Sequence, residues 1–499
     1  MAEKKTYDIP VLEDHLPTPK ISEGALAHVQ SHPAKPELQE KLGFPTELVD
    51  DWEAKAVAKL GELLEKHRSL SVYLDSCVKC GSCSDKCQFF LGSGDPKNMP
   101  VARQDLLRKI YRKYFTVGGK LAPDVVGAVP FTKDVLDEWY TYFHQCSQCK
   151  RCSYFCPYGI DTAEISMAAR EILDHIGMGQ KYTNEVVLKC REIGNNLGLG
   201  PKALVNTVEG LEEDIEDETG VAVRLPVDEV GADVLLIAPS ADFFAEPHVD
   251  SLIGYAKVFH QAGISWTLSS YASEAGNFGL FIGSYEHLHN VSARIRKAAL
   301  DLGVKRIVIG ECGHAWRVAY QFLNTICGPW DFLDQNFPIP QHICEFTHDL
   351  INRGALNLDA SANDDMVLTY HDSCNPSRAA GMGGYPGGQF EIPRAIISAV
   401  CNNFYDMNPD TTHAQTFCCG GGGGLLTEEL MQVRIAGMKP RMQALCQVME
   451  EKGVTHMASI CAICKSQFTG VMPHYKMDPY MIVGVHQLLN NAILLGTKD

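Results

Sequence analysis

Two identical groups of four cysteines constrain this chain more than any other feature. The segments CVKCGSCSDKC and CSQCKRCSYFCP both space their cysteines as C-x2-C-x2-C-x3-C. With this spacing, three neighbouring thiolates bind three irons of a [4Fe–4S] cubane, and the fourth reaches across to a second cluster. The chain is therefore predicted to hold two cubane [4Fe–4S] clusters, one on Cys77, Cys80, Cys83 and Cys156, the other on Cys146, Cys149, Cys152 and Cys87.

Zinc is the main alternative for such thiols, but structural zinc sites use two CxxC pairs with a longer gap between them. Pro157 follows the second motif, whereas Gln88 follows the first, which alters the local turn and removes no ligand. The long segment between the motifs has helical patterning, as in VARQDLLRKIYRKYF. The region therefore resembles an α-helical ferredoxin, which carries electrons but makes no product.

Composition narrows the class of protein further. A length of 499 residues suggests roughly three domains. The net charge of −17 argues against nucleic acid as a partner, because phosphate binding needs a basic surface. No stretch approaches the roughly 18 unbroken apolar residues of a membrane span, and the N-terminus has neither an apolar signal core nor a twin-arginine signal. We therefore expect a cytoplasmic protein.

The second half of the chain is predicted to be one α/β unit repeated. Short β-branched runs alternate with helical patterns, which predicts a parallel sheet flanked by helices in a three-layer unit. MVLTYHDSC parallels VLLIAPSAD, and HMASICAIC parallels RIVIGECGHA, so we infer an internal repeat. The expected parts are an N-terminal helical arm that docks on its own protein or on a neighbouring subunit (1–70), a helical two-cluster ferredoxin domain (71–207), an acidic linker (208–229), a degenerate first repeat (230–350) and a complete second repeat (351–499).

The two copies differ in their cysteines. In the first copy, Asp242, Glu274, Ala275 and Ala315 stand where the second copy has cysteines, and Cys312 alone keeps its counterpart, Cys461. The second copy places its thiols where strands run into loops, which is where ligands collect in open parallel sheets. These five thiols are Cys374, Cys418, Cys419, Cys461 and Cys464.

Five glycines follow the adjacent cysteines in FCCGGGGG. A flexible linker is one interpretation, but a helical pattern begins directly afterwards, which disfavours it. Glycine lets a backbone approach a bulky cluster closely and direct its N–H groups at anionic sulfurs. We therefore predict that Gly420, Gly421 and Gly422 contact a cofactor.

The motifs HDSCNPSR, CCG and CxxC resemble the cysteine-rich CCG domain of the HdrD-like family of heterodisulfide reductases. The resemblance covers residues 71–499 and implies a further catalytic [4Fe–4S] cluster of the non-cubane type, held or flanked by the five thiols. Within the family, the order of parts is most similar to DsrK-type subunits of the DsrMKJOP membrane complex of dissimilatory sulfur metabolism. Such a subunit would lie on the cytoplasmic face of the inner membrane through its partner subunits.

The resemblance also implies partners and a reaction. The partners are a membrane haem b subunit (DsrM-like), other complex subunits and a small cysteine-bearing protein (DsrC-like) as substrate. The reaction is the reduction or oxidation of a disulfide or trisulfide on that protein, coupled to quinone and haem b electron flow. The alternative is an electron-transfer subunit of a flavin-dependent glycolate, lactate or glycerol-3-phosphate dehydrogenase complex.

Several residues near the thiols have alternative interpretations. His371 is predicted either to pass a proton to a leaving thiolate or to be an ordinary loop histidine. Arg378 either steers a partner's acidic tail or pairs with a local acid. Cys312 and His314 are interpreted as remnants of a lost site. Five other cysteines are expected to be small buried apolar residues, namely Cys190, Cys327, Cys344, Cys401 and Cys446.

Overall fold

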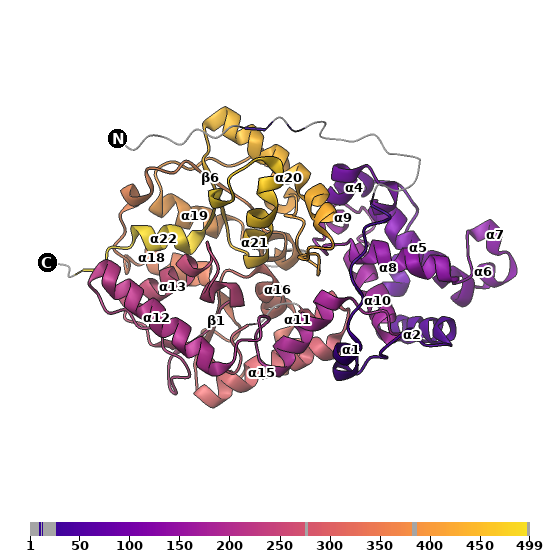
Figure 1. Ribbon diagram of the computed structural model, residues 1–499, viewed down its shortest axis with the longest axis horizontal. Helices are drawn as coiled ribbons and strands as arrows, with labels where there is room; N and C mark the ends of the chain where they lie inside the picture. The colour runs from indigo at the N-terminus through magenta and orange to yellow at the C-terminus, as the bar shows by residue number, and fades with distance from the viewer. Residues whose placement is uncertain (1–8, 11, 13–25, 275–277, 382–386, 497–499) are drawn as a thin grey trace.

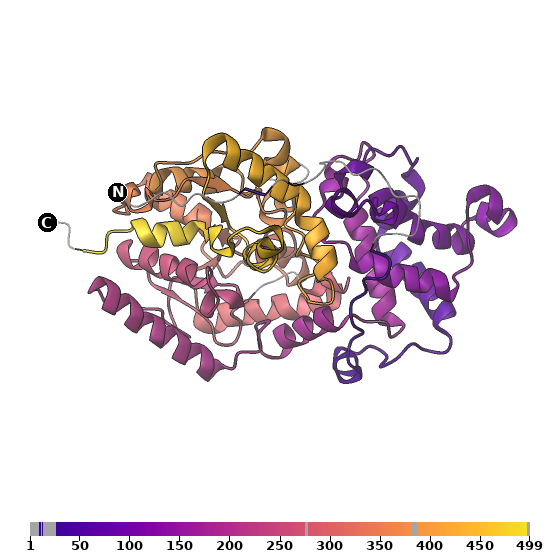
Figure 2. The ribbon, with the colours of Figure 1, turned by 45° about the horizontal axis from the view of Figure 1, so that its top comes forward.

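The structure is a computed structural model that describes residues 9–10, 12, 26–274, 278–381 and 387–496. A helical part, built from the first third of the chain, lies beside a larger α/β part built from the rest (Figure 1, Figure 2). This mixed class, a helical ferredoxin region followed by parallel α/β units, confirms the predicted fold. Much of the predicted N-terminal arm lies outside the described residues.

The helical part packs around one apolar core. Leu107, Trp139, Phe143 and Ile172 are fully buried at its centre, and the helix at 52–66 contributes its apolar face to the same core. Side chains cap several helices: Asp161, for example, accepts from Ala163 N and Glu164 N, which satisfies otherwise unpaired donors. The helices are α1 (Pro36–Leu42), α2 (Trp52–Lys66), α3 (Arg68–Ser76), α4 (Gln88–Ser93), α5 (Pro100–Phe115), α6 (Val117–Leu121), α7 (Pro123–Val126), α8 (Lys133–His144), α9 (Arg151–Tyr154) and α10 (Thr162–His175).

The acidic run differs from the predicted linker. After α11 (Lys181–Glu192), residues 201–219 form the long helix α12 (Pro201–Thr219). The prediction failed because the acids dominate the composition while the apolar residues keep helical spacing. Those apolar residues are buried against the α/β part and are Leu204, Val208, Leu211 and Ile215.

The α/β part contains two parallel sheets with equivalent strands. The first has the order β2-β1-β3-β4 and the second the order β5-β6-β7. In the first sheet, Val234 of β1 lies opposite Arg306 of β3, and in the second sheet, Leu368 of β5 lies opposite His456 of β6. The strands are β1 (Val234–Ile237), β2 (Trp266–Thr267), β3 (Arg306–Ile309), β4 (Gln341–His342), β5 (Leu368–Tyr370), β6 (His456–Ser459) and β7 (Ile482–Gly484).

The connecting helices repeat in the same way. Helix α16 (Gly313–Gln321) follows β3 as α21 (Ala462–Val471) follows β6, and α18 (Ile343–Asn352) follows β4 as α22 (Val485–Ala492) follows β7. The edge strand β2 has a shorter equivalent, a single parallel bridge between Leu368 and Phe404. The remaining helices are α13 (Val249–Gln261), α14 (Phe278–Phe281), α15 (Tyr285–Leu302), α17 (Leu323–Ile326), α19 (Glu391–Val400) and α20 (Met431–Lys452).

The two α/β units share one core. Buried residues of β1 and β3 belong to the same apolar cluster as those of β5, β7 and α22. Helices α13 and α22 approach so closely that a Cβ on Gly254 would lie 2.0 Å from the His486 carbonyl oxygen. The units therefore form one packed body, whose joint places the loops after β3 and β6 beside each other.

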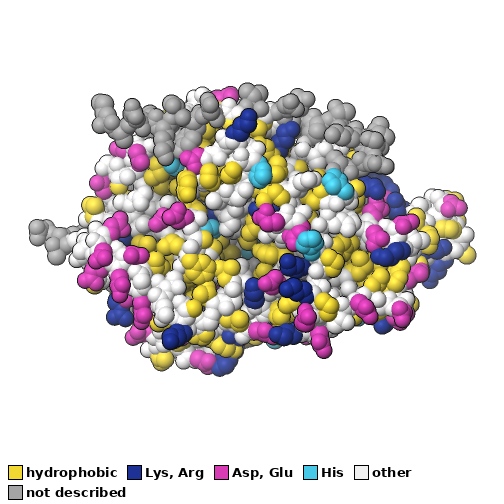
Figure 3. Space-filling model, viewed as in Figure 1, with side chains coloured by type: hydrophobic (Ala, Val, Ile, Leu, Met, Phe, Trp, Pro, Cys, Tyr) yellow, Lys and Arg dark blue, Asp and Glu magenta, His cyan; other side chains and the backbone are white. Residues whose placement is uncertain are grey.

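Side chains of different kinds are mixed on the face of the molecule drawn in Figure 3. On the face drawn in Figure 3, acidic side chains are scattered among basic and apolar ones. Among the helices that the structure describes, none is long and apolar enough to cross a membrane.

Candidate iron–sulfur sites

The first predicted cysteine set surrounds a single cavity. Cys77, Cys80, Cys83 and Cys156 all line a space of about 360 Å³ that is partly open to solvent, and Cys152 of the second set also borders it. Burial raises the pKa of Cys83 to about 12, and the neighbouring Cys156 and Cys77 thiols add to the shift. The side chain of Cys80 is exposed. The four thiols thus converge on a partly open cavity, as ligands of one cluster must.

The second predicted set also comes together, deeper in the protein. Burial, and then the nearby Cys149, Cys146 and Cys87 thiols, raise the pKa of Cys152 well above its usual value. The guanidinium of Arg103, itself buried, lies close to Cys146 and Cys87. A buried cation beside this set is suited to an anionic cluster.

Both cysteine loops use the same backbone conformation. Lys79 and Gly81 in the first loop have φ of 56° and 82°, and Gln148 and Lys150 in the second have φ of 57° and 58°. These left-handed residues stand two and four positions after the first cysteine of each motif. Left-handed conformations are unfavourable for residues other than glycine, so three such residues in two equivalent loops indicate a functional constraint.

The way in which the cysteines of each set converge decides whether they fit a multi-iron cluster or a single metal ion. Among the described residues, no three His, Cys, Asp or Glu side chains converge closely enough to hold a single metal ion. Ligands of a cubane need not meet at one point, because each thiolate binds a different iron. The two converging sets therefore fit [4Fe–4S] clusters.

Gln88, which replaces the proline of the second motif, is fixed by hydrogen bonds. Its Nε2 donates to Ser147 Oγ at 2.9 Å, and its Oε1 lies 3.7 Å from Cys149 Sγ. The residue therefore ties the first cysteine loop to the second, an interaction that the spacing of the motifs could not indicate.

The five thiols of the second α/β unit form a continuous group. Cys374 Sγ and Cys418 Sγ are 3.8 Å apart. Cys419 lies beside both Cys418 and Cys464, and Cys464 lies beside Cys461. All five are buried, on the segments that follow β5, precede α20 and follow β6. Hydrogen bonds from Cys418 and Cys464 lower the pKa of Cys419 to about 5, so a thiolate forms readily here.

The glycine run faces the helical part. A Cβ on Gly423 would lie 2.7 Å from the Cys146 carbonyl oxygen, and one on Gly422 would lie 3.2 Å from the Ser147 carbonyl oxygen. Arg170 Nη1 donates to the Gly423 carbonyl oxygen at 2.7 Å. The N–H of Gly420 donates to Cys418 Sγ at 3.3 Å. Close packing against the second cysteine loop thus accounts for much of the glycine requirement.

The second set and the five-thiol group are in direct contact. The Cys418 thiol lies close enough to Cys149 to raise the pKa of Cys149 well above its usual value, together with burial. Arg378 reinforces this contact: its Nε and Nη2 donate to the Cys149 carbonyl oxygen at 3.0 and 2.8 Å, and its Nη1 donates to the Thr416 carbonyl oxygen at 2.9 Å. Both predictions for Arg378 are therefore wrong, because the side chain is buried and bonds carbonyl oxygens instead of acids.

His371 is fully buried behind the thiols. Its ring meets Phe468 edge-on with 4.9 Å between centroids, and neither ring nitrogen has a hydrogen-bond partner. Burial, and then the charges of Arg441 and Arg378, hold the pKa of His371 well below its usual value. The imidazole is therefore neutral, and it would have to take up a proton against its surroundings to act as a shuttle.

A buried ion pair joins the two α/β units, and sequence reasoning missed it. Glu311 Oε2 lies 3.1 Å from Lys465 Nζ, and Glu311 Oε1 lies 2.9 Å from His486 Nδ1. Burial acts to raise the pKa of Glu311, but Lys465 and His486 overcome this and hold it at about 2. The only signal in the sequence was that Glu311 and Lys465 adjoin cysteines.

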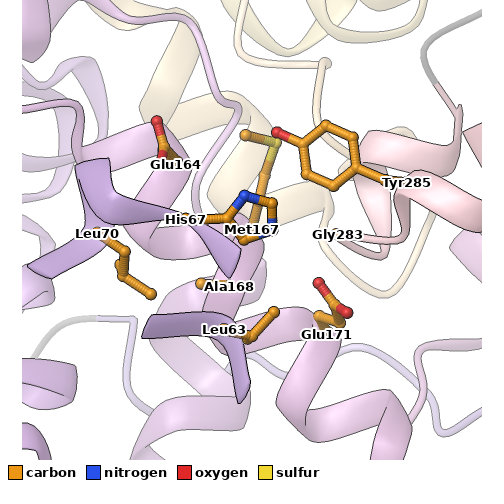
Figure 4. A pocket seen from close by; sticks show the side chains of 9 residues that line it. All are labelled: Leu63, His67, Leu70, Glu164, Met167, Ala168, Glu171, Gly283 and Tyr285. Atoms are coloured by element: carbon orange, nitrogen blue, oxygen red, sulfur yellow. The ribbon is translucent and has the colours of Figure 1, made fainter. Parts of the chain in front are cut away.

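One pocket lies apart from the thiols. It measures about 290 Å³, lies between α2, α10 and α15 and is lined by His67, Glu164 and Tyr285 among others, and no cysteine borders it (Figure 4).

The cysteines outside the two sets and the five-thiol group were predicted to be buried. Cys327 is only half-buried, which differs from this prediction. The other four cysteines of that group are buried as expected, namely Cys190, Cys344, Cys401 and Cys446.

A helical region with two converging cysteine sets, in contact with a buried group of five thiols, defines an iron–sulfur oxidoreductase subunit. Residues 73–160 match the family of 4Fe-4S dicluster domains. The chain is 41% identical to the Hdr-like menaquinol oxidoreductase iron-sulfur subunit of Archaeoglobus profundus, over 90% of this chain and 84% of the relative. It is 39% identical to the Hdr-like menaquinol oxidoreductase iron-sulfur subunit 2 of Archaeoglobus fulgidus, with the same coverage.

The chain therefore belongs to the family of Hdr-like menaquinol oxidoreductase iron–sulfur subunits. It is also 25% identical to the HdrD chain of the dihydromethanophenazine:CoB–CoM heterodisulfide reductase of Methanosarcina mazei, over 85% of this chain and 95% of the relative. The predicted HdrD-like family is confirmed by these relatives. No solved structure matches the chain.

Proposed function

We propose that this chain is the catalytic iron–sulfur subunit of a membrane-associated complex and exchanges electrons with a protein-bound disulfide. The observation that carries the proposal is the contact of Cys149 with Cys418, because it joins an electron-carrying module directly to a thiol site. A module for electron transfer alone would not need five buried thiols at the end of its path.

The order of electron carriers follows from burial. The first set contains the exposed Cys80, the second set is more deeply placed, and the five thiols are buried beyond it. Two cubane [4Fe–4S] clusters would supply one-electron transfer at the first two positions. The third would be a [4Fe–4S] cluster of non-cubane type, held by Cys374, Cys418, Cys419, Cys461 and Cys464 with Gly420, Gly421 and Gly422 around it.

The proposed substrate is a disulfide or trisulfide on a small cysteine-bearing protein of the DsrC kind. Cleavage of one S–S bond consumes two electrons and leaves two thiolates, which take up two protons; oxidation is the reverse. The names of the relatives support both ends of the path, since two are called menaquinol oxidoreductase subunits and one belongs to a heterodisulfide reductase. The membrane partner would be a haem b subunit of the DsrM kind, and the chain would lie on the cytoplasmic face.

Electron paramagnetic resonance of anaerobically purified, oxidised protein tests the proposal. Oxidised cubanes of this type are silent, so a signal that shifts on adding a cysteine-bearing partner protein is expected from the third cluster. Iron for only two clusters, together with no signal in either sample, would reduce the chain to an electron carrier and contradict the proposal.

A further inference from the structure

Three buried side chains beside the thiols form a chain of hydrogen bonds. Arg317 Nη1 donates to Asn375 Oδ1 at 3.3 Å, and Asn375 Nδ2 lies 3.2 Å from His314 Nε2. Because a guanidinium has no acceptor, the oxygen of Asn375 must face Arg317 and its amino group must face His314. His314 Nε2 is then the acceptor, and the ring proton lies on Nδ1.

This chain ends in an unused donor on each side. Arg317 Nε and His314 Nδ1 both lack a hydrogen-bond partner, although Arg317 is 1% and His314 3% exposed. The charge that acts most on Arg317 is that of the Asp161 carboxylate, which is itself paired with Lys150 at 2.9 Å. Buried donors without partners are rare in folded proteins.

Two other buried arginines nearby are held by several hydrogen bonds. Arg378 makes four hydrogen bonds to carbonyl oxygens, and Arg170 makes five. Arg317 has the same burial but leaves Nε unused, as Arg441 also does. Arg317 differs from Arg441 because Asn375 links it to His314 and to Cys374.

Asn375 and His314 of this chain lie at the five-thiol group. Asn375 Nδ2 is 3.8 Å from Cys374 Sγ, and the His314 ring is beside Cys461, whose thiol it contacts. A Cβ on Gly313 would lie 3.2 Å from Cys461 Sγ, which shows how closely the start of α16 approaches the thiols. The charge of Arg317 acts on Asp161 and then on Cys374 and Cys149.

We propose that His314, Asn375 and Arg317 form a binding site for a sulfur anion at the five-thiol group, with donors supplied by the first α/β unit. This inference rests on the proposed function and deepens it. The anion is either sulfur of the third cluster or the thiolate that leaves when the substrate disulfide is cleaved. In both cases, charge-assisted N–H groups hold it. His314 is then a working part of the site and no remnant.

Arg317→Met removes the charge and the donors at nearly constant length. The oxidised variant and wild type are titrated with 2-mercaptoethanol, and the resonance signal of the third cluster reports binding. If the anion is the substrate thiolate, the variant binds this thiol about 10-fold or more weakly, with an unchanged signal before thiol is added. If the anion is cluster sulfur, the midpoint potential of the third cluster falls without thiol, because a nearby positive charge is lost.

Two further variants serve as controls. Arg317→Lys keeps the charge and loses the planar fork, so it carries the same test if Arg317→Met fails to assemble the third cluster. Arg394→Met removes a buried guanidinium whose Nε, Nη1 and Nη2 already donate to Asp372, Asp406 and the Phe390 carbonyl oxygen. Its affinity for 2-mercaptoethanol should equal that of wild type, and an equal loss in both arginine variants would contradict a specific anion site.

Unchanged thiol affinity together with an unchanged potential in Arg317→Met, with the third cluster present, would overturn the inference alone. A wild-type protein with no third cluster would instead overturn the proposed function. The cubane signals of each sample after reduction with dithionite show whether the rest of the protein is intact.

Discussion

The two α/β units share the order of their equivalent strands and the helices that follow these strands, yet the second carries five thiols and the first has acids at two of the equivalent positions. After β1, the first unit places Asp242, whose carboxyl oxygens have no hydrogen-bond partner and whose pKa burial raises well above its usual value. After β5, the second unit places Cys374. The shared apolar core lies on the strands and helices, whereas the differences lie in the loops at the strand ends. The fold therefore does not need the thiols, and the chemistry of each unit depends on its loops.

Substitutions at the equivalent cysteines Cys312 and Cys461 test most directly whether the two units differ in function. Both cysteines are N-caps, of α16 and α21, but Cys312 Sγ accepts from Ala315 N while Cys461 makes no cap bond. Cys461→Ser should lose the iron and the resonance signal of the third cluster and reduce thiol-coupled electron transfer to background. Cys312→Ser, which installs a good capping residue, should keep both. Equal iron loss in the two variants would mean that the units are not functionally distinct.

Glu311→Gln tests how strongly the units depend on each other. Removing one partner of a buried ion pair leaves Lys465 uncompensated, so the free energy of unfolding should fall by about 3–5 kcal/mol. Chemical denaturation followed by circular dichroism measures it. Asp301→Asn, which breaks an exposed pair with Lys297, is the control and should change little. An effect as small as that of the control would show that the units are joined by their apolar core alone.

The low pKa of Glu311 predicts that the stability of the protein depends on pH in the acid range. The folded pKa of Glu311 is about 2 against an ordinary value of 4.5, so its contribution is present above pH 4.5 and is lost as the pH falls toward 2. Wild-type stability should decline across this window, and the decline should be shallower in Glu311→Gln. Parallel pH profiles of the two proteins would contradict the assignment.

Gly423→Ala tests the glycine run that the first unit lacks. Gly423 has φ of 66°, and a Cβ would lie 2.7 Å from the Cys146 carbonyl oxygen, so strain and overlap together should cost about 2 kcal/mol or more. Gly328→Ala, with φ of 82° and open space around it, isolates the backbone strain of about 1 kcal/mol. Thermal unfolding compares them. If the two variants lose equal stability, the run does not serve close packing.

His371→Gln should have the smallest effect. A neutral, unpartnered imidazole does not change protonation near neutrality, so the pH profile of thiol-coupled turnover should stay in place. A displaced profile would establish the proton-transfer role that the sequence suggested for His371.

Local patterns in the sequence predicted much of this structure. Both cysteine sets follow from spacing, because ligand geometry is set within a few residues, and the parallel sheets follow from alternating strands and helices. Helix α12 was missed because its acids hid the apolar spacing of Leu204, Val208, Leu211 and Ile215. Arg378 and Arg317 were beyond prediction, since their partners lie on elements distant in sequence and only packing brings them together.

The exposure of Cys80 makes the first cysteine set the part of the protein most accessible to dissolved oxygen. A cluster held on that cavity would meet dissolved oxygen first, because Cys80 is exposed whereas the cysteines of the second set are partly or fully buried and the five thiols are buried. Damage would therefore begin at the outer end and disconnect the chain from its electron supply while the inner thiols stay intact. A sample handled in air would still respond to added thiol, yet it would no longer turn over with its partner.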